Sequence, residues 1–397
     1  MLFITVEIMI TIVKNSRCLQ YIFITIFVCL ISCTKSNVSH CYPFFGTKDI
    51  VIKDVCFDTL VISGEVTSLN GEWLIHNNKL FYNDYLITAL IEFDTLGNYV
   101  ENKIKHGRAS NEWVVPFVTV TPHDTSIYCV DFAWNIHCYN NSYSRKIRPT
   151  PMLHDISYSN SDWNNLLHNP DVDEPRMYEY NLDSRNILIY NDVLILPIVT
   201  EHVKYNGYYV NANAKSFWKD SFIFMELNKN DFTTMKLFGH YPEIYSTKNI
   251  TIFSKYYADT YNDELLVSFN ADSLIYCYNK DGVVTNAFGY SASNIEDDYP
   301  ETYTYEDFQK LRKEYLKDYG YYSHLKVIGN YIFRTYKSAG ENSYGIQIYH
   351  GKDLIGDIKM TQEAYVFGEI NGIYYAALPA DIDNDCYKLL KFRLPND

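Results

Sequence analysis

A repeated strand pattern constrains the fold of this chain more than any other feature. Each unit has an apolar strand, a short turn, a second strand that ends in an aromatic residue beside a polar one, and a turn into a third strand. We expect Gly97 and Gly282 to supply the positive φ angle that two of these turns need. Six such units follow one another, at residues 79–100, 126–141, 186–239, 264–284, 330–358 and 372–394.

The repeat predicts an all-β fold, a six-bladed β-propeller over residues 46–397. One small sheet cannot bury both of its faces, whereas sheets packed radially bury them and leave only short edges. The uneven spacing leaves open an irregular pair of β-sandwiches, or a ring of five or seven blades. The last unit lacks an outermost strand, and residues 49–58 (DIVIKDVCFD) are predicted to supply it and close the ring. Cys56 and Cys386 would then lie in the same blade.

The composition is that of a packed globular protein, with 47% hydrophobic and 21% charged residues. Its 38 tyrosines favour β structure, because aromatic side chains suit a half-buried pleated surface. The formal net charge is −14 and no basic cluster stands out. Nucleic acid is therefore not an expected partner, since its binding depends on neutralising phosphates.

Two segments depart from the strand pattern. Thr304–Asp307 has the composition of a capping box, and the residues after it predict a short helix that ends at Gly320. This helix would lie between the fourth and fifth blades and cover a blade edge or one mouth of the ring. The second segment, residues 149–185, is predicted to be a polar loop with a short helix. Long insertions between regular elements often carry function.

The N-terminal region is typical of a targeting segment. Lys14 and Arg17 precede an apolar stretch at residues 21–32 (YIFITIFVCLIS), which is too short to span a membrane. The stretch runs through Leu-Ile-Ser into Cys33, and this resembles the lipobox of bacterial lipoproteins, in which the cysteine thiol receives the lipid. Several acyl chains together anchor a protein stably.

These residues predict a signal peptide at 1–32, lipidation at Cys33 and a lipidated, polar tether over 33–45. An ordinary signal peptide or a membrane anchor is the alternative, and the start codon could be Met1 or Met9. The predicted address is the cell envelope, with a lipid anchor in the membrane.

The cysteines and the familiar catalytic motifs indicate no metal and no cofactor. No two cysteines form a CxxC pair, so zinc and thioredoxin-like sites are not indicated. Cys129 and Cys138 could face each other on adjacent strands, or be buried free thiols. The run Asp381–Asp385 has the alternating acids of a calcium loop, but Cys386 stands where that loop needs glycine, which favours a solvated turn. HExxH, Walker A, GxGxxG and GxSxG motifs are absent from the sequence, and no catalytic residue is predicted.

Three features give the chain a family resemblance: the lipobox at Cys33, the loop Gly107–Glu112, and the stretch from Glu314 to Arg334, where an acidic, tyrosine-rich helix precedes an aromatic strand. With them the chain resembles Bacteroidota lipoproteins that carry a TolB-like six-bladed β-propeller, a family of unknown function. The loop departs from the family's Gly-x-Gly-Pro-x-Glu pattern by an alanine and a serine. The resemblance covers most of residues 33–397 and implies the fold and an outer-membrane address. The tether has no acidic cluster after Cys33, which favours a periplasm-facing protein.

Four residues are candidates for the channel or a ligand site. Arg334 stands in an otherwise apolar strand (YIFRTY), and a buried arginine needs a partner, for which Glu369 is the candidate. The two could line the central channel or form an ion pair between blades. Arg108 and Glu112 could likewise line a mouth of the ring or belong to a connecting turn.

Three functions are compatible with these features. The favoured one is an envelope-anchored, non-catalytic module that binds a protein or glycan partner. A glycan hydrolase or lyase that uses the channel is the first alternative, because propellers host such enzymes, although a fold alone is a weak reason. A structural assembly protein without a small ligand is the second. The ligand, the oligomeric state and the cysteine pairing cannot be read from the sequence.

Overall fold

The structure is a computed structural model that describes residues 42–63, 67–151, 160–190, 192–200, 202, 205, 214–295, 298–302, 304–340 and 342–395. Residues Phe44–Asp397 form one compact unit. The predicted signal peptide, the lipidation at Cys33, the two possible start codons and Cys41 all lie outside the described residues. No helix in the described ranges is long and apolar enough to cross a membrane.

The described residues of this unit form six sheets that follow one another along the chain, and their strands are antiparallel except for one parallel pair in the first sheet and one in the fifth. The first holds β3 (Gly71–His76), β4 (Lys79–Asp84), β5 (Ala89–Phe93), β6 (Tyr99–His106) and the short β7 (Glu112–Trp113). The second holds β8 (Phe117–His123), β9 (Ser126–Asp131), β10 (Asn135–Asn140) and β11 (Arg145–Pro151). The third holds β12 (Glu179–Tyr180), β13 (Leu188–Tyr190), β14 (Val193–Val199), β15 (Phe224–Asn228) and β16 (Thr234–Phe238).

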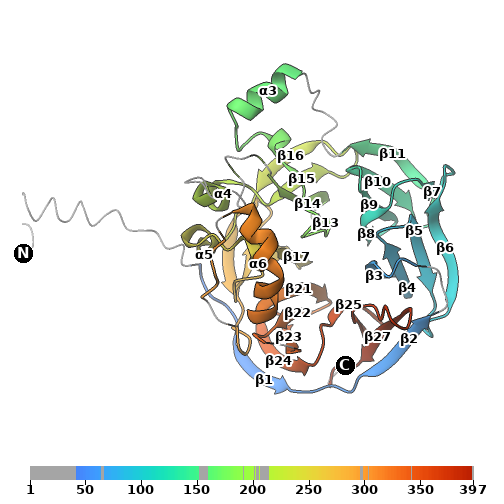
Figure 1. Ribbon diagram of the computed structural model, residues 1–397. Helices are drawn as coiled ribbons and strands as arrows, with labels where there is room; N and C mark the ends of the chain where they lie inside the picture. The colour runs from blue at the N-terminus through green and yellow to red at the C-terminus, as the bar shows by residue number, and fades with distance from the viewer. Residues whose placement is uncertain are drawn as a thin grey trace, which may run out of the picture. The chain divides into compact units, whose positions relative to one another are not determined.

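The remaining three sheets repeat this plan. The fourth holds β17 (Tyr256–Tyr261), β18 (Glu264–Phe269), β19 (Ile275–Tyr278) and β20 (Val284–Phe288). The fifth holds β21 (Tyr321–Ile328), β22 (Tyr331–Lys337), β23 (Tyr344–His350) and β24 (Asp353–Met360). The sixth holds β25 (Tyr365–Ile370), β26 (Ile373–Ala377) and β27 (Cys386–Phe392). The sheets stand around a common axis as a six-bladed β-propeller (Figure 1), which confirms the predicted fold class and number of blades.

Two N-terminal strands complete the ring. β2 (Asp58–Ser63) pairs antiparallel with β27 and becomes the outermost strand of the sixth sheet. β1 (Lys48–Ile52) pairs parallel with β24 at the edge of the fifth sheet. Closure by an N-terminal strand is therefore confirmed, but the predicted segment 49–58 was wrong, because most of it belongs to β1 or to the linker that follows. Cys56 is exposed in that linker and does not share a blade with Cys386.

The hydrophobic core lies between neighbouring blades. Trp73 of the first sheet is buried against Tyr387 of the sixth, with ring centroids 5.4 Å apart in an edge-to-face arrangement. It also packs against Tyr82 and Phe93 of its own sheet, at 5.1 and 5.4 Å. Each such aromatic pair adds about 1 kcal/mol beyond the burial of apolar area. The many tyrosines therefore serve mainly as core in this fold.

Two of the turns between strands contain the glycines that the repeat predicted. Gly97 has a φ of +86° and Gly282 a φ of +73°, as predicted. A methyl group at Gly282 would come within 2.7 Å of the Phe238 ring, so this position excludes a side chain for two independent reasons.

The helix α6 (Tyr305–Asp318) lies between β20 and β21 in the chain. Its N-terminus is confirmed, because the Thr304 hydroxyl accepts a hydrogen bond from the Asp307 N–H at 3.0 Å. The predicted glycine cap at Gly320 was wrong: the helix ends at Asp318, and the next residue is extended. The buried ammonium of Lys337 replaces the glycine cap, since it donates to the Lys317 carbonyl at 2.6 Å.

Shorter helices occupy other connections. The predicted second insertion holds α3 (Asn160–His168) and the single turn η1 (Pro175–Met177), while residues 152–159 lie outside the described ranges. Two helices in the third blade and its exit were not predicted, α4 (Ala214–Asp220) and α5 (Glu243–Thr247).

The five cysteines in the described part of the chain are free thiols, namely Cys56, Cys129, Cys138, Cys277 and Cys386. Cys129 pairs in register with His137, and Cys138 pairs with Tyr128. Neighbouring positions along a strand point to opposite faces of a sheet. The two thiols therefore do not face each other, and the disulfide that their spacing allowed is not formed.

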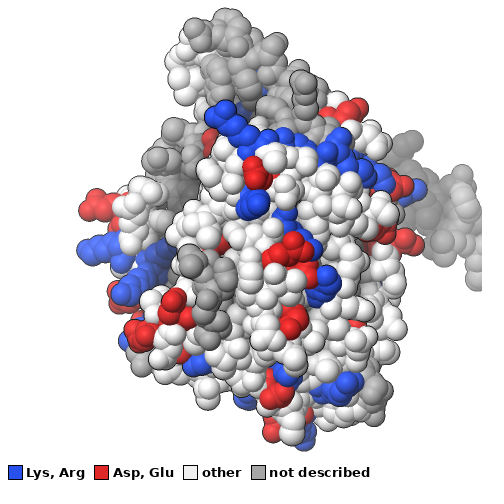
Figure 2. Space-filling view, turned by 90° about the vertical axis from the view of Figure 1, so that its right-hand side faces the viewer, with Lys and Arg blue, Asp and Glu red and all other residues white. Residues whose placement is uncertain are grey.

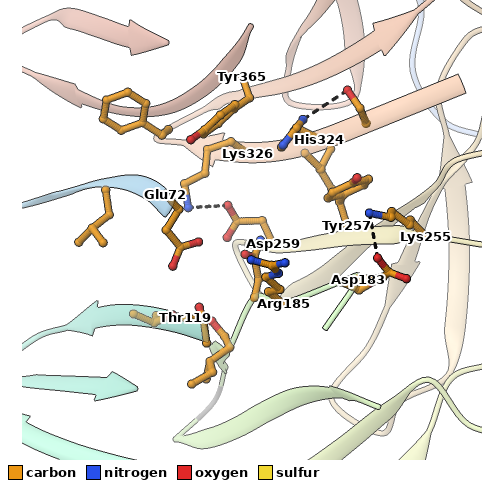
Figure 3. Close-up of a pocket in the computed structure, with 18 of the residues that line it drawn as sticks. Glu72, Thr119, Asp183, Arg185, Lys255, Tyr257, Asp259, His324, Lys326 and Tyr365 are labelled. Carbon is orange, nitrogen blue, oxygen red and sulfur yellow. Dashed lines mark hydrogen bonds and ion pairs between the residues drawn. The ribbon is translucent and has the colours of Figure 1, made fainter. Parts of the chain in front are cut away.

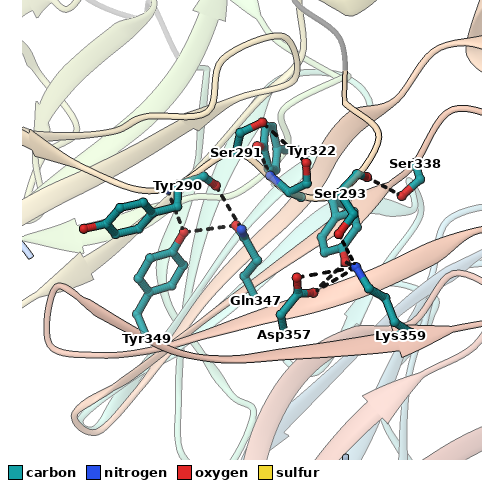
Figure 4. Close-up of polar contacts among 11 residues, drawn as sticks. Tyr290, Ser291, Ser293, Tyr322, Ser338, Gln347, Tyr349, Asp357 and Lys359 are labelled. Carbon is teal, nitrogen blue, oxygen red and sulfur yellow. Dashed lines mark hydrogen bonds and ion pairs between the residues drawn. The ribbon is translucent and has the colours of Figure 1, made fainter. Parts of the chain in front are cut away.

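The segment after β20 is fastened to the fifth sheet (Figure 4). The Gln347 side-chain amide donates to the Tyr290 carbonyl at 2.9 Å. The Lys359 ammonium donates to the Ser293 hydroxyl at 2.7 Å, and the Ser338 hydroxyl donates to the Ser293 carbonyl at the same distance. These bonds fix the start of the connection that leads to α6.

The outer surface mixes both signs of charge in the view of Figure 2, where acidic and basic side chains lie among one another below a row of basic ones. The first sheet shows this mixing in detail. Lys79 and Lys103 contact the buried Glu92 carboxylate at 2.6 and 2.9 Å. Two ammonium groups thus offset the cost of burying one carboxylate.

Candidate functional site

A cavity of about 660 Å³ lies at the centre of the ring and is lined mainly by the innermost strands. Those strands are β3, β8, β13, β17, β21 and β25 (Figure 1). Figure 3 labels ten of the lining residues, which are Glu72, Thr119, Asp183, Arg185, Lys255, Tyr257, Asp259, His324, Lys326 and Tyr365.

Strand alternation explains why polar side chains gather there. Tyr257 and Asp259 are two residues apart on β17, and His324 and Lys326 are two apart on β21. Residues at this spacing point to the same face of a strand, and on these strands that face is the cavity.

His324 is held between two tyrosine rings. Its imidazole stacks on Tyr365 with centroids 4.6 Å apart and planes 13° apart, and it lies 5.1 Å from the Tyr257 ring at 31°. Its Nδ1 is 3.8 Å from a carboxylate oxygen of Glu363. Burial lowers the pKa of His324, and the nearby carboxylate opposes this shift only in part. The ring therefore stays neutral at pH 7, with one nitrogen as donor and the other as acceptor.

Two ion pairs cross the cavity wall (Figure 3). The Lys326 ammonium lies 2.9 Å from the Asp259 carboxylate, which also accepts the Val327 N–H at 2.9 Å. The Lys255 ammonium lies 3.0 Å from Asp183. Both carboxylates are thus held in fixed positions by cations.

The helix α6 also borders this cavity, through Arg312 and Leu316. The Arg312 guanidinium lies 4.0 Å from the Asp183 carboxylate, so the helix meets the ring at an ion pair already formed with Lys255. The sequence left open whether this helix covers a blade edge or a mouth of the ring. The structure places it at the border of the central cavity.

Glu72 accepts its hydrogen bonds from neutral donors. Its Oε1 accepts two weak hydrogen bonds at 3.3 Å, from the Asn83 side-chain amide and from the Val120 N–H. Burial raises the pKa of Glu72, because removing water disfavours the charged form. The Arg185 guanidinium, stacked 4.3 Å from the Tyr85 ring centroid, opposes this shift from further away.

The charges around the cavity balance. Its wall carries four acids, Glu72, Asp183, Asp259 and Glu363, and four bases, Arg185, Lys255, Arg312 and Lys326. The cavity therefore offers many directional polar groups without a large net charge. Such a wall suits a ligand that presents donors and acceptors in turn, rather than one that presents a single strong charge.

Comparisons with known proteins address the fold. The sequence matches no known protein-family profile, and no curated protein sequence is similar to it. A member of the DUF4221 family from Bacteroides vulgatus ATCC 8482 superposes with a TM-score of 0.62 at 13% identity, over 87% of this chain and 99% of the other. The shared architecture is a six-bladed β-propeller.

A second solved structure, a candidate exported protein from Bacteroides fragilis NCTC 9343, gives a TM-score of 0.51 at 13% identity over 89% of this chain and 100% of the other. At this identity the likeness shows the fold alone. Both neighbours come from Bacteroides, in agreement with the resemblance found in the sequence, whereas the lipid anchor and the TolB-like character stay predictions.

Arg334 is not among the residues that line the central cavity. Its side chain is fully buried in β22, and its guanidinium donates to the carbonyl oxygens of Ser273, at 2.6 Å, and of Asp272. The guanidinium also lies over the Tyr322 ring, 3.3 Å from its centroid. Arg334 therefore joins the fourth and fifth blades through backbone carbonyls, in place of the predicted ion pair with Glu369.

The other three candidates also sit outside the cavity wall. Glu369 accepts a hydrogen bond from the Gly372 N–H across the turn between β25 and β26. Glu112 accepts the N–H groups of Arg108 and Ala109 at 2.8 and 2.9 Å. Arg108 and Glu112 thus form a connecting turn, one of the two alternatives for this loop.

Residues Asp381–Asp385, whose acidic spacing is similar to that of a calcium loop, also form a turn. The Asp381 carboxylate accepts the Asn384 amide at 3.1 Å and the Lys388 ammonium at 2.7 Å. Over the described residues, no cluster of three or more histidine, cysteine or acidic side chains is placed to hold a metal ion.

The residues that line the cavity were missed because the repeat was read from its apolar strands. In five of the six blades the innermost strand precedes the unit that the sequence pattern marks, whereas β13 of the third blade lies inside it. On β17 and β21, polar side chains occupy alternate positions, as in Tyr257–Asp259 and His324–Lys326. This alternation before an apolar hairpin is the sequence pattern that could have identified these cavity residues.

Proposed function

We propose that the protein is an envelope lipoprotein, anchored through Cys33, whose β-propeller binds a neutral, hydroxyl-rich ligand such as a glycan segment without transforming it. The observation that carries this proposal is the central cavity, where balanced charges and tyrosines from several blades surround one space. Sugar hydroxyls both donate and accept hydrogen bonds, so they suit a wall in which donors and acceptors alternate.

The size of the cavity supports a small ligand. At about 660 Å³ it falls within the range of small-molecule sites. An assembly protein without a ligand has no need of a polar cavity at the ring centre, which is why this alternative is not proposed.

Calorimetric titration with short soluble oligosaccharides, neutral and uronate-containing, tests the binding proposal. We expect neutral oligosaccharides to bind, and Glu72→Leu and Lys326→Met each to weaken binding about tenfold, because each replaces a polar side chain by an apolar one and so removes a contact worth roughly 1–2 kcal/mol. Glu101→Leu is the matched control, since Glu101 is exposed on the outer strand β6. Binding that neither cavity variant weakens would place the ligand elsewhere and refute the proposal.

The anchor needs a separate test, because Cys33 lies outside the described residues. Intact-mass measurement and membrane fractionation of the wild type and Cys33→Ala, in a bacterial host that processes lipoproteins, distinguish the alternatives. We expect only the wild type to lose residues 1–32, gain acyl mass and sediment with membranes. Equal behaviour of the two proteins would leave a secreted or otherwise anchored module.

A catalytic role is the second candidate, and one observation favours it. Burial raises the pKa of Glu72, which is what a general acid needs, and the Asp259 carboxylate shares the same cavity. In a hydrolysis, Glu72 would protonate the leaving glycosidic oxygen while water adds to the anomeric carbon and loses its proton to Asp259. Release of new reducing ends by the wild type, lost in Glu72→Gln while binding persists, would establish this role over simple binding.

A further inference from the structure

A second cavity, of about 170 Å³, lies beside the third blade and is lined by a set of aromatic rings. Trp134 comes from the turn between β9 and β10, Tyr180 from β12, Phe217 and Trp218 from α4, and Tyr241 from the loop after β16. Residues far apart in the chain therefore converge on one small space.

The rings are arranged edge to face. Trp134 meets Tyr180 at 75° with centroids 5.9 Å apart, and Trp218 meets Tyr241 at 88° with centroids 4.7 Å apart. The Trp218 indole is fixed by a hydrogen bond from its Nε1 to the Asn249 side chain at 2.9 Å. Such a set of differently oriented rings resembles a cage, and each ring face carries a partial negative charge.

The charged side chains among the described residues that border this cavity are acidic. Glu179, exposed at the start of β12, and Asp183 both border it, and no lysine or arginine is among the described residues that do. The central cavity, in contrast, has as many bases as acids. Asp183 borders both cavities, and its charge is offset by Lys255 at 3.0 Å and Arg312 at 4.0 Å, which both line the central one.

Trp134 adopts a backbone conformation that its side chain disfavours. Its φ is +63°, in the left-handed region where glycine and asparagine are at ease and bulky residues are rare. The turn is held by the Asp131 carboxylate, which accepts the N–H groups of Ala133 and Asn135 at 2.8 and 2.9 Å. A tryptophan kept at such a position, half-exposed at the cavity, fits a role in ligand contact rather than in folding.

We infer that this aromatic cavity binds a small alkylammonium group, quaternary or primary. Aromatic faces attract an organic cation through their quadrupoles, and desolvation in a cage strengthens that attraction. The Glu179 carboxylate borders the same space, and the volume suits a trimethylammonium head rather than a larger ligand. This site shares Leu182 and Asp183 with the wall of the proposed glycan cavity, but the inference does not depend on glycan binding there.

Calorimetry with choline as the probe, and with 3,3-dimethylbutan-1-ol as its uncharged analogue of the same shape, tests the inference on the full chain. We expect choline to bind and the uncharged analogue to bind at least about tenfold more weakly, because only the cation gains the ring and carboxylate attraction. Equal binding of the two compounds, or no choline binding up to ~10 mM, would overturn it.

Two variants locate the site. Trp134→Gly removes the indole at a position where glycine is the residue most tolerant of the backbone, so the fold should persist while choline binding falls more than about tenfold. Glu179→Gln should weaken choline binding about threefold and leave the uncharged analogue unaffected. Glu101→Gln, another exposed strand glutamate, is the control. Unchanged choline binding in Trp134→Gly would show that the cation binds elsewhere and refute the assignment.

Discussion

Arg334→Met would test whether a single buried side chain joins two blades. The guanidinium is fully buried, donates to the Ser273 and Asp272 carbonyls of the fourth blade, and lies 3.3 Å from the centroid of the Tyr322 ring. Methionine keeps much of the length and the apolar contacts of arginine but has no donor. The substitution therefore leaves two buried carbonyls without their partner.

The expected loss follows from these contacts. A hydrogen bond from a charged donor contributes about 1.5–3 kcal/mol, and a desolvated cation–π contact about 2 kcal/mol. Removing the charge also removes its own burial cost, which offsets part of the loss. We therefore expect the free energy of unfolding to fall by about 4 kcal/mol. The compact unit spans Phe44–Asp397. An unfolding entropy of about 2.1 cal/mol/K per residue then converts this loss into a Tm about 5 °C lower.

Circular dichroism during heating and urea titration measures both quantities. Arg393→Met is the matched control, because the Arg393 guanidinium also donates to a backbone carbonyl, that of Gly372 at 3.1 Å, but is exposed. Its loss should stay within about 0.5 kcal/mol. If Arg334→Met costs no more than Arg393→Met, the buried guanidinium does not hold the two blades together and the reasoning fails.

Three further predictions concern pH, a turn and the thiols. Burial lowers the pKa of His324 below 6.5, so the unfolded chain binds more protons than the folded one below that pH. The contribution of His324 to the free energy of unfolding should thus be complete above about pH 6.5 and be lost as the pH drops through the folded pKa. In urea titrations at pH 5.5 and 7.5, the free energy of unfolding should decrease less in His324→Phe than in the wild type. An equal decrease in the two proteins would contradict this. Gly282→Ala should lower the free energy of unfolding by about 1 kcal/mol more than Gly329→Ala, since both positions have positive φ but only the first meets a neighbouring ring, and an equal loss would argue against the clash. Alkylation of the native protein, mapped by mass spectrometry, should modify the exposed Cys56 quickly and spare Cys277, because burial raises the pKa of Cys277 to about 12; rapid labelling of Cys277 would contradict the structure.

The fold could be predicted from the sequence because the middle strands of each blade are largely apolar and buried on both faces. In β5 and β19 all the residues are buried, and such runs stand out against the turns that flank them. The innermost strands are different, because one face of each meets the cavity. Asp259 interrupts β17 and Lys326 interrupts β21, so a search for apolar runs passes over the strands that form the candidate site.

Two predictions failed because they depend on contacts between distant parts of the chain. Arg334 was correctly singled out as a buried arginine that needs a partner, but its partners are backbone carbonyls, which no side-chain pattern reveals. The sequence predicted that Gly320 ends α6. In the structure the Lys337 ammonium, from β22, donates hydrogen bonds to the carbonyls of Lys317 and Tyr319 at this end of the helix. Both contacts depend on how blades and insertions meet in space.

The closure of the ring by β1 and β2 has a consequence for biosynthesis. Synthesis begins at the N-terminus, so these two strands leave the ribosome first, whereas β24 and β27, their partners, come among the last. Until then both strands have open hydrogen-bonding edges, and Val51 and Val61 on them are exposed even in the finished ring. A chain cut short before Cys386 can never seal the sixth blade. Completion of synthesis is thus a condition for a stable product, and truncated chains should be the ones that aggregate or are degraded.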